Sequence, residues 1–274
     1  MKTLKWIGLS LMGILLGFNF ISCSSDSVSD EIDDGIINNQ KKLVQVKTDA
    51  DYGICWDFSY DSKGRLASVE YRQYFDYDAP DIDASEIELS NIDWGENSIT
   101  KTTSRQGYSD DDIVEFSLSD GLVRQIAAGD GYGGTITYNS NKQLSIYMRD
   151  FGSRTTSLTW GEDNTVVAVK DDHTIDSYTE NIIYSDIKCQ GYFPIFYYAV
   201  NVFVDDVFSL VHPELFGLRT NSLPVSILWT TDDGTMEEEY SYTFDKEGYV
   251  ESCVIRHAYS DGYLSTTNYA FKWE

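Results

Sequence analysis

Several acidic side chains that could bind a cation lie close together between residues 76 and 86. The carboxylates in question are those of Asp76, Asp78, Asp81 and Asp83. Ca²⁺ prefers oxygen ligands and takes about six to eight of them. The spacing is not that of an EF-hand, and no glycine stands at the bend that such a loop requires. A solvated acidic loop is therefore the favoured interpretation, and a calcium site is the alternative.

The second group of residues that could bind a ligand is aromatic. Five rings fall within one short, irregular segment, namely Tyr192, Phe193, Phe196, Tyr197 and Tyr198. Exposed rings could stack on sugar rings or anchor a protein partner. The same rings could instead plug one end of a sheet, and this packing interpretation is favoured. A ligand-binding platform at these five residues is thus a hypothesis to test against the fold.

No recognised catalytic motif is present. The chain lacks a Gly-x-Ser-x-Gly sequence, and its histidines, His173, His212 and His257, are far apart. Residues 129–134 are rich in glycine but lead into a strand, so they indicate a hairpin loop and not a phosphate-binding loop. Two facing carboxylates could serve a glycosidase, but the 45 acidic residues leave no pair to nominate. We therefore name no catalytic residue and no cofactor.

Cysteine spacing argues against a metal site built from thiolates. Apart from Cys23, the cysteines are Cys55, Cys189 and Cys253, and no two of them form a Cys-x-x-Cys pair. Small buried side chains are the favoured interpretation of all three. One disulfide and one free thiol remain an alternative in an oxidising compartment.

The net charge limits the class of partner. The chain has 45 acidic and 20 basic residues, which gives a formal charge of −25. Nucleic-acid binding needs surfaces rich in lysine and arginine, so we expect no nucleic-acid partner. Electrostatic attraction to anionic lipid is disfavoured for the same reason.

The N-terminus is typical of an exported bacterial lipoprotein. Two lysines precede an apolar run from Trp6 to Ile21, which is too short for a comfortable membrane span of about 20 residues. Ile21-Ser22-Cys23 resembles the lipobox, in which the cysteine is acylated and becomes the first residue. We therefore expect a signal peptide at 1–22, lipid on Cys23, a flexible tether at 23–40 and one domain at 41–274.

A repeated pattern predicts the fold. An apolar–x–aromatic triplet leads into a polar turn and then an aliphatic pair, as in Phe58-Ser59-Tyr60 followed by the turn 61–65, Leu66 and Val69. Further copies surround residues 136–147, 158–169 and 242–253, with weaker ones near 94–97 and 116–126. Alternating side chains and Asp/Asn-Gly turns are typical of β-hairpins. Hairpins in series predict an all-β antiparallel meander, either a large curved sheet or an open barrel.

Two segments require separate interpretation. Residues 199–215 have Phe203, Val207 and Val211 at helical spacing, and we expect a short helical insertion there, capped by Asn201 and ended by Pro213.

The run Glu237-Glu238-Glu239 lies in a predicted strand. Charged residues commonly protect edge strands, so we expect this strand to lie at an edge of the sheet.

The repeats carry a family resemblance. Tyr60-Asp61-Ser62-Lys63-Gly64-Arg65-Leu66 and the similar 244–250 look like YD-type repeats. With the lipobox, they make the chain resemble an uncharacterised Bacteroidetes lipoprotein family, a domain of unknown function built from such hairpins. The resemblance and Ser24-Ser25-Asp26 imply an outer-membrane lipoprotein whose domain faces the periplasm or the outside. We expect non-catalytic binding of a glycan or a protein, and the alternative is a cell-envelope hydrolase, a carboxylate-based glycosidase.

Overall fold

The computed structural model describes residues 40–49, 53–74, 86–129, 133–150, 154–173, 177–199, 205–218 and 220–274. The strands are β1 (Leu43–Thr48), β2 (Ile54–Tyr60), β3 (Leu66–Gln73), β4 (Glu86–Trp94), β5 (Ser98–Arg105), β6 (Asp112–Ser119), β7 (Leu122–Ala128), β8 (Gly134–Tyr138), β9 (Leu144–Arg149), β10 (Thr155–Trp160), β11 (Val166–Asp172), β12 (Tyr178–Lys188), β13 (Ser222–Thr231), β14 (Gly234–Phe244), β15 (Val250–Tyr259) and β16 (Leu264–Trp273). The helices are η1 (Glu162–Asn164), α1 (Phe196–Ala199), α2 (Asp206–Val211) and η2 (Pro213–Phe216).

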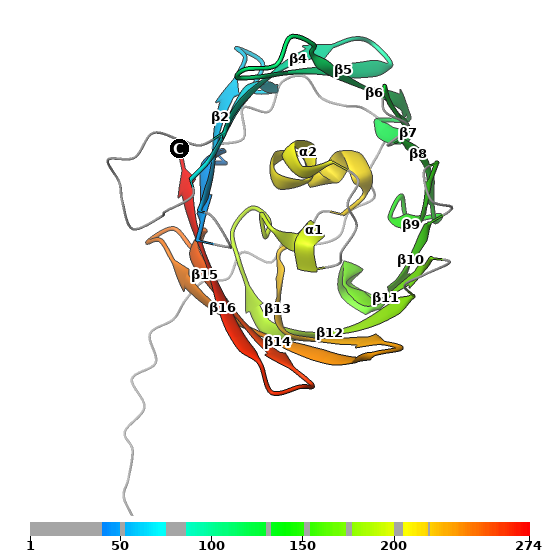
Figure 1. Cartoon of the computed structure of the whole chain (residues 1–274), viewed down its shortest axis with the longest axis vertical. Coiled ribbons are helices and arrows are strands. Elements are labelled where there is room, and N and C mark those ends of the chain that lie inside the picture. The colour runs from blue at the N-terminus through cyan, green and yellow to red at the C-terminus, as the bar shows by residue number, and fades with distance from the viewer. Residues whose placement is uncertain are drawn as a thin grey trace, which may run out of the picture. The chain divides into compact units, whose positions relative to one another are not determined.

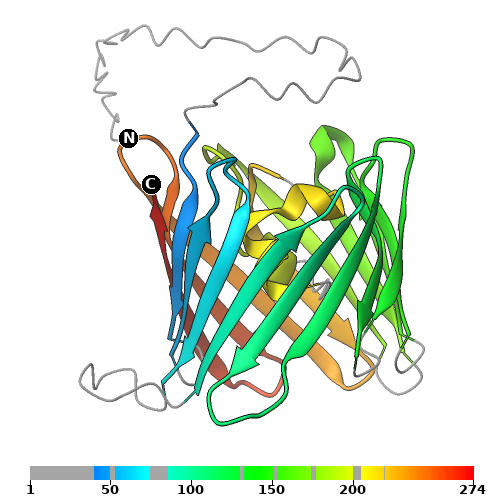
Figure 2. The same ribbon diagram turned by 90° about the horizontal axis from the view of Figure 1, so that it is seen from above.

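These sixteen strands form one closed antiparallel barrel (Figures 1 and 2). Each strand pairs with the strands before and after it in sequence, and β1 closes the barrel by pairing with β16. The predicted antiparallel meander of hairpins is confirmed. The closure, which the sequence left undecided between an open barrel and a curved sheet, comes from the pairing of the first and last strands.

The edge-strand interpretation of the three glutamates is wrong. Strand β14 pairs with β13 over residues 234–239 and with β15 over residues 236–244, so the three glutamates do not lie on an edge. Because side chains alternate between the two faces of a strand, Glu237 and Glu239 are exposed outside the barrel whereas Glu238 is buried inside it.

The sequence repeat corresponds to one hairpin whose aromatic residue bonds to the neighbouring hairpin. Tyr60 ends β2 and donates its hydroxyl hydrogen to the carbonyl oxygen of Leu43, at 2.6 Å. The same contact recurs around this end of the barrel from Trp94 to Leu66, Tyr138 to Val123, Trp160 to Leu144, Tyr184 to Val166 and Trp273 to Val250. Where a repeat has Tyr or Trp before its turn, this residue therefore links successive hairpins at the end of the barrel where the turns lie.

The turns of the repeat share one geometry. The side-chain oxygen of Asp61 accepts hydrogen bonds from the backbone N–H groups two and four residues later, and Asn139 and Asp245 do the same. The fourth residue of each turn has a positive φ, which is +82° at Gly64 and +61° at Lys142. Asx side chains and a residue that tolerates positive φ are thus what makes these turns tight.

The segment between β12 and β13 lies inside the ring of strands (Figure 1). It holds α1, α2 and η2 in place of the continuous helix expected near 199–215. Asp205 caps α2, accepting a hydrogen bond from the Phe208 N–H at 3.0 Å. Asn201, the cap expected from the sequence, lies outside the described residues. Pro213 begins η2, in agreement with a break at that residue.

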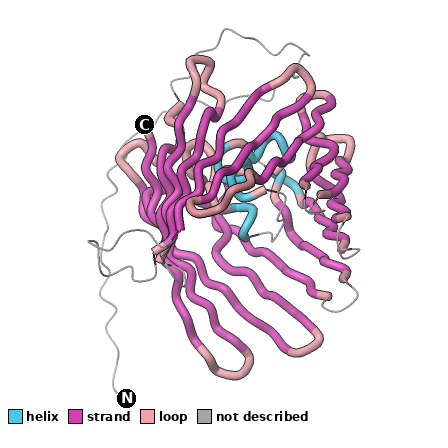
Figure 3. Tube along the Cα trace, turned by 45° about the horizontal axis from the view of Figure 1, so that its top comes forward, coloured by secondary structure: helices cyan, strands magenta, loops and turns pink. Residues whose placement is uncertain are grey.

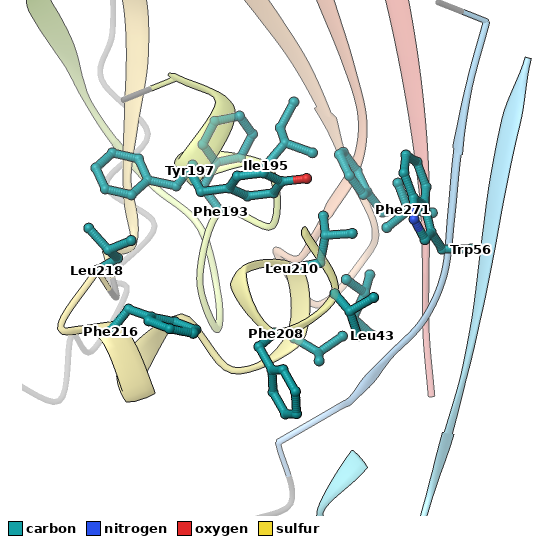
Figure 4. Packing of buried hydrophobic residues seen from close by; sticks show 14 of the residues in the cluster. Leu43, Trp56, Phe193, Ile195, Tyr197, Phe208, Leu210, Phe216, Leu218 and Phe271 are labelled. Carbon is teal, nitrogen blue, oxygen red and sulfur yellow. The ribbon is translucent and has the colours of Figure 1, made fainter. Parts of the chain in front are cut away.

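This inserted segment fills one half of the barrel with apolar side chains. Phe193, Ile195, Phe208 and Phe216 are at most 1% exposed, and Figure 4 shows them converging with Leu43 and Phe271 of the wall. The ring of Phe208 lies 5.0 Å from that of Phe116 on β6. A barrel of this many strands is too wide for its own side chains to fill, so the insertion completes the core.

The cysteines follow the favoured interpretation. Cys55, Cys189 and Cys253 are all buried and free. Burial raises the pKa of Cys189 to about 12, so this thiol stays protonated and unreactive at neutral pH.

Substitution of Tyr60 by Phe tests the contact between hairpins. The change removes the hydroxyl donor to Leu43 and keeps the ring, so we expect the free energy of unfolding to fall by about 1 kcal/mol. Tyr263→Phe is the matched control because its ring is 62% exposed, and it should have no measurable effect. Equal urea midpoints for the two variants would contradict the role given to the aromatic residue.

Substitution of Gly217 by Ala tests the docking of the insertion. At φ +62°, a Cβ here would clash with the carbonyl oxygen of Lys142, in the turn between β8 and β9. Gly107 also has positive φ, +88°, but nothing lies within 4 Å of its Cβ position. Gly107→Ala should cost about 1 kcal/mol for the backbone alone. In thermal melts Gly217→Ala should be clearly less stable than Gly107→Ala, and similar melts would show that the insertion does not need this close approach.

Candidate functional site

The inner wall of the barrel changes from apolar to polar along its length. Strand β12 starts at the end away from the insertion, and its inward residues run in the order Tyr178, Glu180, Ile182. Strands β14 and β15 show the same gradient. We use the term polar wall for the inward residues at the end opposite the insertion that belong to β11–β15: Asp171, Tyr178, Glu180, Trp229, Glu238 and His257.

Asp171 is the centre of the first polar cluster on this wall. Its carboxylate is fully buried and accepts hydrogen bonds from Arg154 Nε and from the Thr156 hydroxyl, both at 2.6 Å. The Arg154 guanidinium lies over the ring of Tyr178, at 5.5 Å from its centroid. Burial, together with the negative charges of Glu180 and Asp171, raises the pKa of the Tyr178 hydroxyl above its ordinary value. The tyrosine is therefore a neutral hydrogen-bonding group at any physiological pH.

Glu238 is the centre of the second cluster. One carboxylate oxygen accepts a hydrogen bond from the Tyr240 hydroxyl at 2.6 Å, and the other lies 3.1 Å from His257 Nδ1. The second ring nitrogen of His257 lies 3.2 Å from the hydroxyl of Thr267 on β16. Burial, with the negative charge of Glu238, raises the pKa of the Tyr240 hydroxyl well above its ordinary value.

Sequence reasoning missed this second cluster. His257 has no other histidine near it in the chain, and Glu238 lies within a run of three glutamates that was interpreted as edge protection. The signal that could have found the cluster is strand alternation, because the middle glutamate must face opposite to its two neighbours. Pairing of Glu238 with His257 depends on the register of β14 against β15, which only the fold supplies.

The Thr267 hydroxyl, the His257 imidazole and the Glu238 carboxylate lie in the order of a nucleophile, a base and an orienting group. Acyl transfer also needs free N–H donors for the developing oxyanion. Along this stretch β15 is paired with both β14 and β16, which commits its backbone N–H groups to the sheet. The arrangement is therefore suited to hydrogen bonding.

Aromatic rings accompany the polar groups at the same end. The rings of Tyr178 and Trp229 lie 5.5 Å apart on the inner wall. The rings of Tyr259 and Tyr263, at the tip of the β15–β16 hairpin, also lie 5.5 Å apart, and they are 40% and 62% exposed. Flat apolar faces thus stand beside fixed charges.

The aromatic residues named from the sequence belong to the insertion. Phe193, Phe196 and Tyr197 are 1–2% exposed, so they are core residues and form no exposed platform. Tyr192 is half-buried and packs against Trp273. The side chain of Tyr198 lies outside the described residues, as do Cys23 and the four aspartates of the calcium hypothesis, Asp76, Asp78, Asp81 and Asp83.

Two further observations concern the described part of the chain alone. It contains no group of three or more His, Cys, Asp or Glu side chains placed to hold a metal ion. None of its helices is long and apolar enough to cross a membrane.

Substitution of Asp171 by Asn tests the cluster around this carboxylate. Removing one partner of a buried ion pair leaves Arg154 without its counter-charge, so we expect a loss of about 3 kcal/mol in the free energy of unfolding. The neighbouring Asp172 is exposed and pairs with Lys170 outside the barrel. Asp172→Asn should change stability by less than about 0.5 kcal/mol. Equal urea midpoints for the two variants would disprove a structural role for the buried carboxylate.

Comparison with known proteins gives a likeness of fold. Neither a protein-family model nor a curated protein matches the chain. The crystal structure of a porin-like protein from Bacteroides uniformis is similar, with a TM-score of 0.55 and 16% identity over 85% of this chain and 96% of that chain. That of a porin-like protein from Bacteroides vulgatus has a TM-score of 0.57 and 15% identity over 86% and 99% of the two chains. At these identities the likeness shows that this chain shares the barrel fold of porin-like proteins.

Proposed function

We propose that this protein is a cell-envelope lipoprotein that binds a glycan, without catalysis, on the polar wall. The observation that carries the proposal is the placing of Tyr178 opposite Asp171 and of Trp229 opposite Glu180 on neighbouring strands, with the two rings 5.5 Å apart. Sugar rings offer apolar C–H faces to aromatic rings and hydroxyl groups to charged partners. Trp229 and His257 keep part of their surface exposed beside the buried groups of the wall, and this mixture at one end of a barrel is suited to such a ligand.

The polar groups of the wall are held in position before a ligand arrives. Asp171 is fixed by Arg154 and Thr156, and Glu238 by Tyr240 and His257. Groups that are already ordered lose little conformational entropy on binding, so more of the interaction energy appears as affinity. This favours recognition of a ligand with a defined set of hydroxyl positions.

The envelope location rests on the N-terminal sequence and on the hairpin repeats. Cys23 follows the lipobox-like Ile21-Ser22, and the repeats resemble those of the Bacteroidetes lipoprotein family with YD-type hairpins. The two porin-like proteins with a similar barrel fold also come from Bacteroides species. We therefore propose lipid attachment at Cys23 and an outer-membrane location.

Substitution of Trp229 by Ala tests the glycan site. The full chain is assayed on a glycan array, and the best binder is titrated against each variant. Loss of one stacking ring should weaken binding about tenfold, which corresponds to about 1.4 kcal/mol. Tyr108→Ala is the control, because Tyr108 is 72% exposed in the β5–β6 loop at the same end of the barrel but off the polar wall.

Three results would count against the proposal. A folded protein that binds no glycan on the array would overturn the ligand class and favour a protein partner. Equal weakening by Trp229→Ala and Tyr108→Ala would overturn the location. Release of sugar from the bound glycan, abolished by Glu238→Gln, would overturn the non-catalytic part and favour the glycosidase alternative.

A further inference from the structure

The outer wall of the barrel has the opposite polarity to that of a membrane-spanning barrel. In a spanning barrel the outward residues form an apolar band about 25 Å tall and the interior is polar. Here the outward residues of β14 are Thr235, Glu237, Glu239, Ser241 and Thr243, all exposed. The inward residues of the same strand include Tyr240 and Tyr242, which belong to or pack against the core.

Exposed charges stand well inside the strands at several places around the barrel. They belong to β3, β6, β11, β14 and β15 and are Glu70, Glu115, Lys170, Glu239 and Arg256. Figure 1 shows β6, β11 and β15 on different sides of the ring, and Figure 3 shows the same ring of strands in an oblique view. An arginine or lysine facing lipid at the bilayer midplane costs about 2–4 kcal/mol. A bilayer around this wall would have to accommodate such groups on many strands at once.

In the part of the barrel that the structure describes, several outward apolar residues have polar neighbours on the same face. Ile113 on β6 is followed on the same face by Glu115, and Ile183 on β12 is preceded by Asn181. Leu89 on β4 is likewise followed by Asn91. Single exposed apolar residues with polar neighbours are ordinary on surfaces in contact with water.

The insertion gives the barrel an apolar core of its own. Burial of apolar surface inside the ring, by Phe193, Phe208 and Phe216 against the wall, gives the fold a water-excluding core. We infer that the outer wall faces water, and that the protein's contact with the membrane is confined to the lipid proposed on Cys23. This protein is then a barrel of porin-like fold whose outer wall is exposed to water.

The entry of the chain into the barrel is compatible with this arrangement. Lys42 pairs with Glu274 next to the last strand, and the Lys41 N–H donates to the Tyr249 hydroxyl at 3.0 Å. Lys41 Nζ also pairs with Asp245, in the turn between β14 and β15. The chain therefore enters at the end closed by the insertion, and the polar wall lies at the other end.

The test is release of the barrel by cutting the tether. A recognition sequence for a site-specific protease is inserted between Asp30 and Glu31 of the full chain, and the chain is expressed in a Gram-negative host. Isolated outer membranes are washed at high salt, treated with the protease in detergent-free buffer and sedimented. We expect nearly all of the cut barrel in the supernatant, with a β-rich circular dichroism spectrum and a cooperative melt.

The other outcomes test the water-facing outer wall and the anchor at Cys23 separately. A fully cut barrel that stays in the pellet and needs detergent for extraction would overturn the water-facing outer wall. A full chain that is soluble before the cut would support the water-facing wall and overturn the anchor at Cys23. The chain without the inserted sequence is the control, and it should remain in the pellet under the same protease treatment. The outcome does not depend on the glycan proposal.

Discussion

The structure depends on the filling of a wide barrel by its own chain. Sixteen strands enclose more space than the side chains of their inner faces can occupy. The segment between β12 and β13 supplies the missing apolar volume, with Phe193, Phe208 and Phe216 packed against residues of the wall such as Phe116. The apolar side chains of the insertion are therefore buried in the interior of the barrel, whereas the apolar band of a membrane barrel lies on its outer surface.

The position of the insertion also divides the inner wall into two parts. Where the insertion packs, the inward residues are apolar and the aromatic residues of the repeats bond from hairpin to hairpin. Beyond it, the wall carries the buried carboxylates of Asp171 and Glu238, whose hydrogen-bonding partners lie on their own or neighbouring strands. Buried charges are stable only when they are paired, so the clusters around Asp171 and Glu238 had to form as complete sets.

Likeness of fold and likeness of surface are separate properties in this protein. The barrel resembles those of porin-like proteins, yet Glu239 and Arg256 lie opposite each other on its outer face. The strand pairing of a barrel is made by the backbone and does not depend on which face is apolar. The same architecture can therefore be surrounded by lipid or by water, and the side chains decide which.

The sequence by itself determined the local structure. The hairpins, their Asx turns and the antiparallel order follow from alternation and turn chemistry within a few residues, as at Asp61 and Gly64. Burial of the three cysteines also followed from their residue type and spacing. The helical insertion was placed correctly, but its division into α1, α2 and η2 was not, because packing inside the barrel overrides helix periodicity.

Only the tertiary structure decided closure, the assignment of faces and the candidate site. Alternation shows that Glu238 faces opposite to Glu237 and Glu239, but it does not show which side is the interior. Pairing of Glu238 with His257 depends on the register of β14 against β15, and pairing of β1 with β16 joins the first and last strands of the barrel. The site was therefore not predictable from the sequence, because its members lie on several successive strands and meet only through the register of each strand against the next.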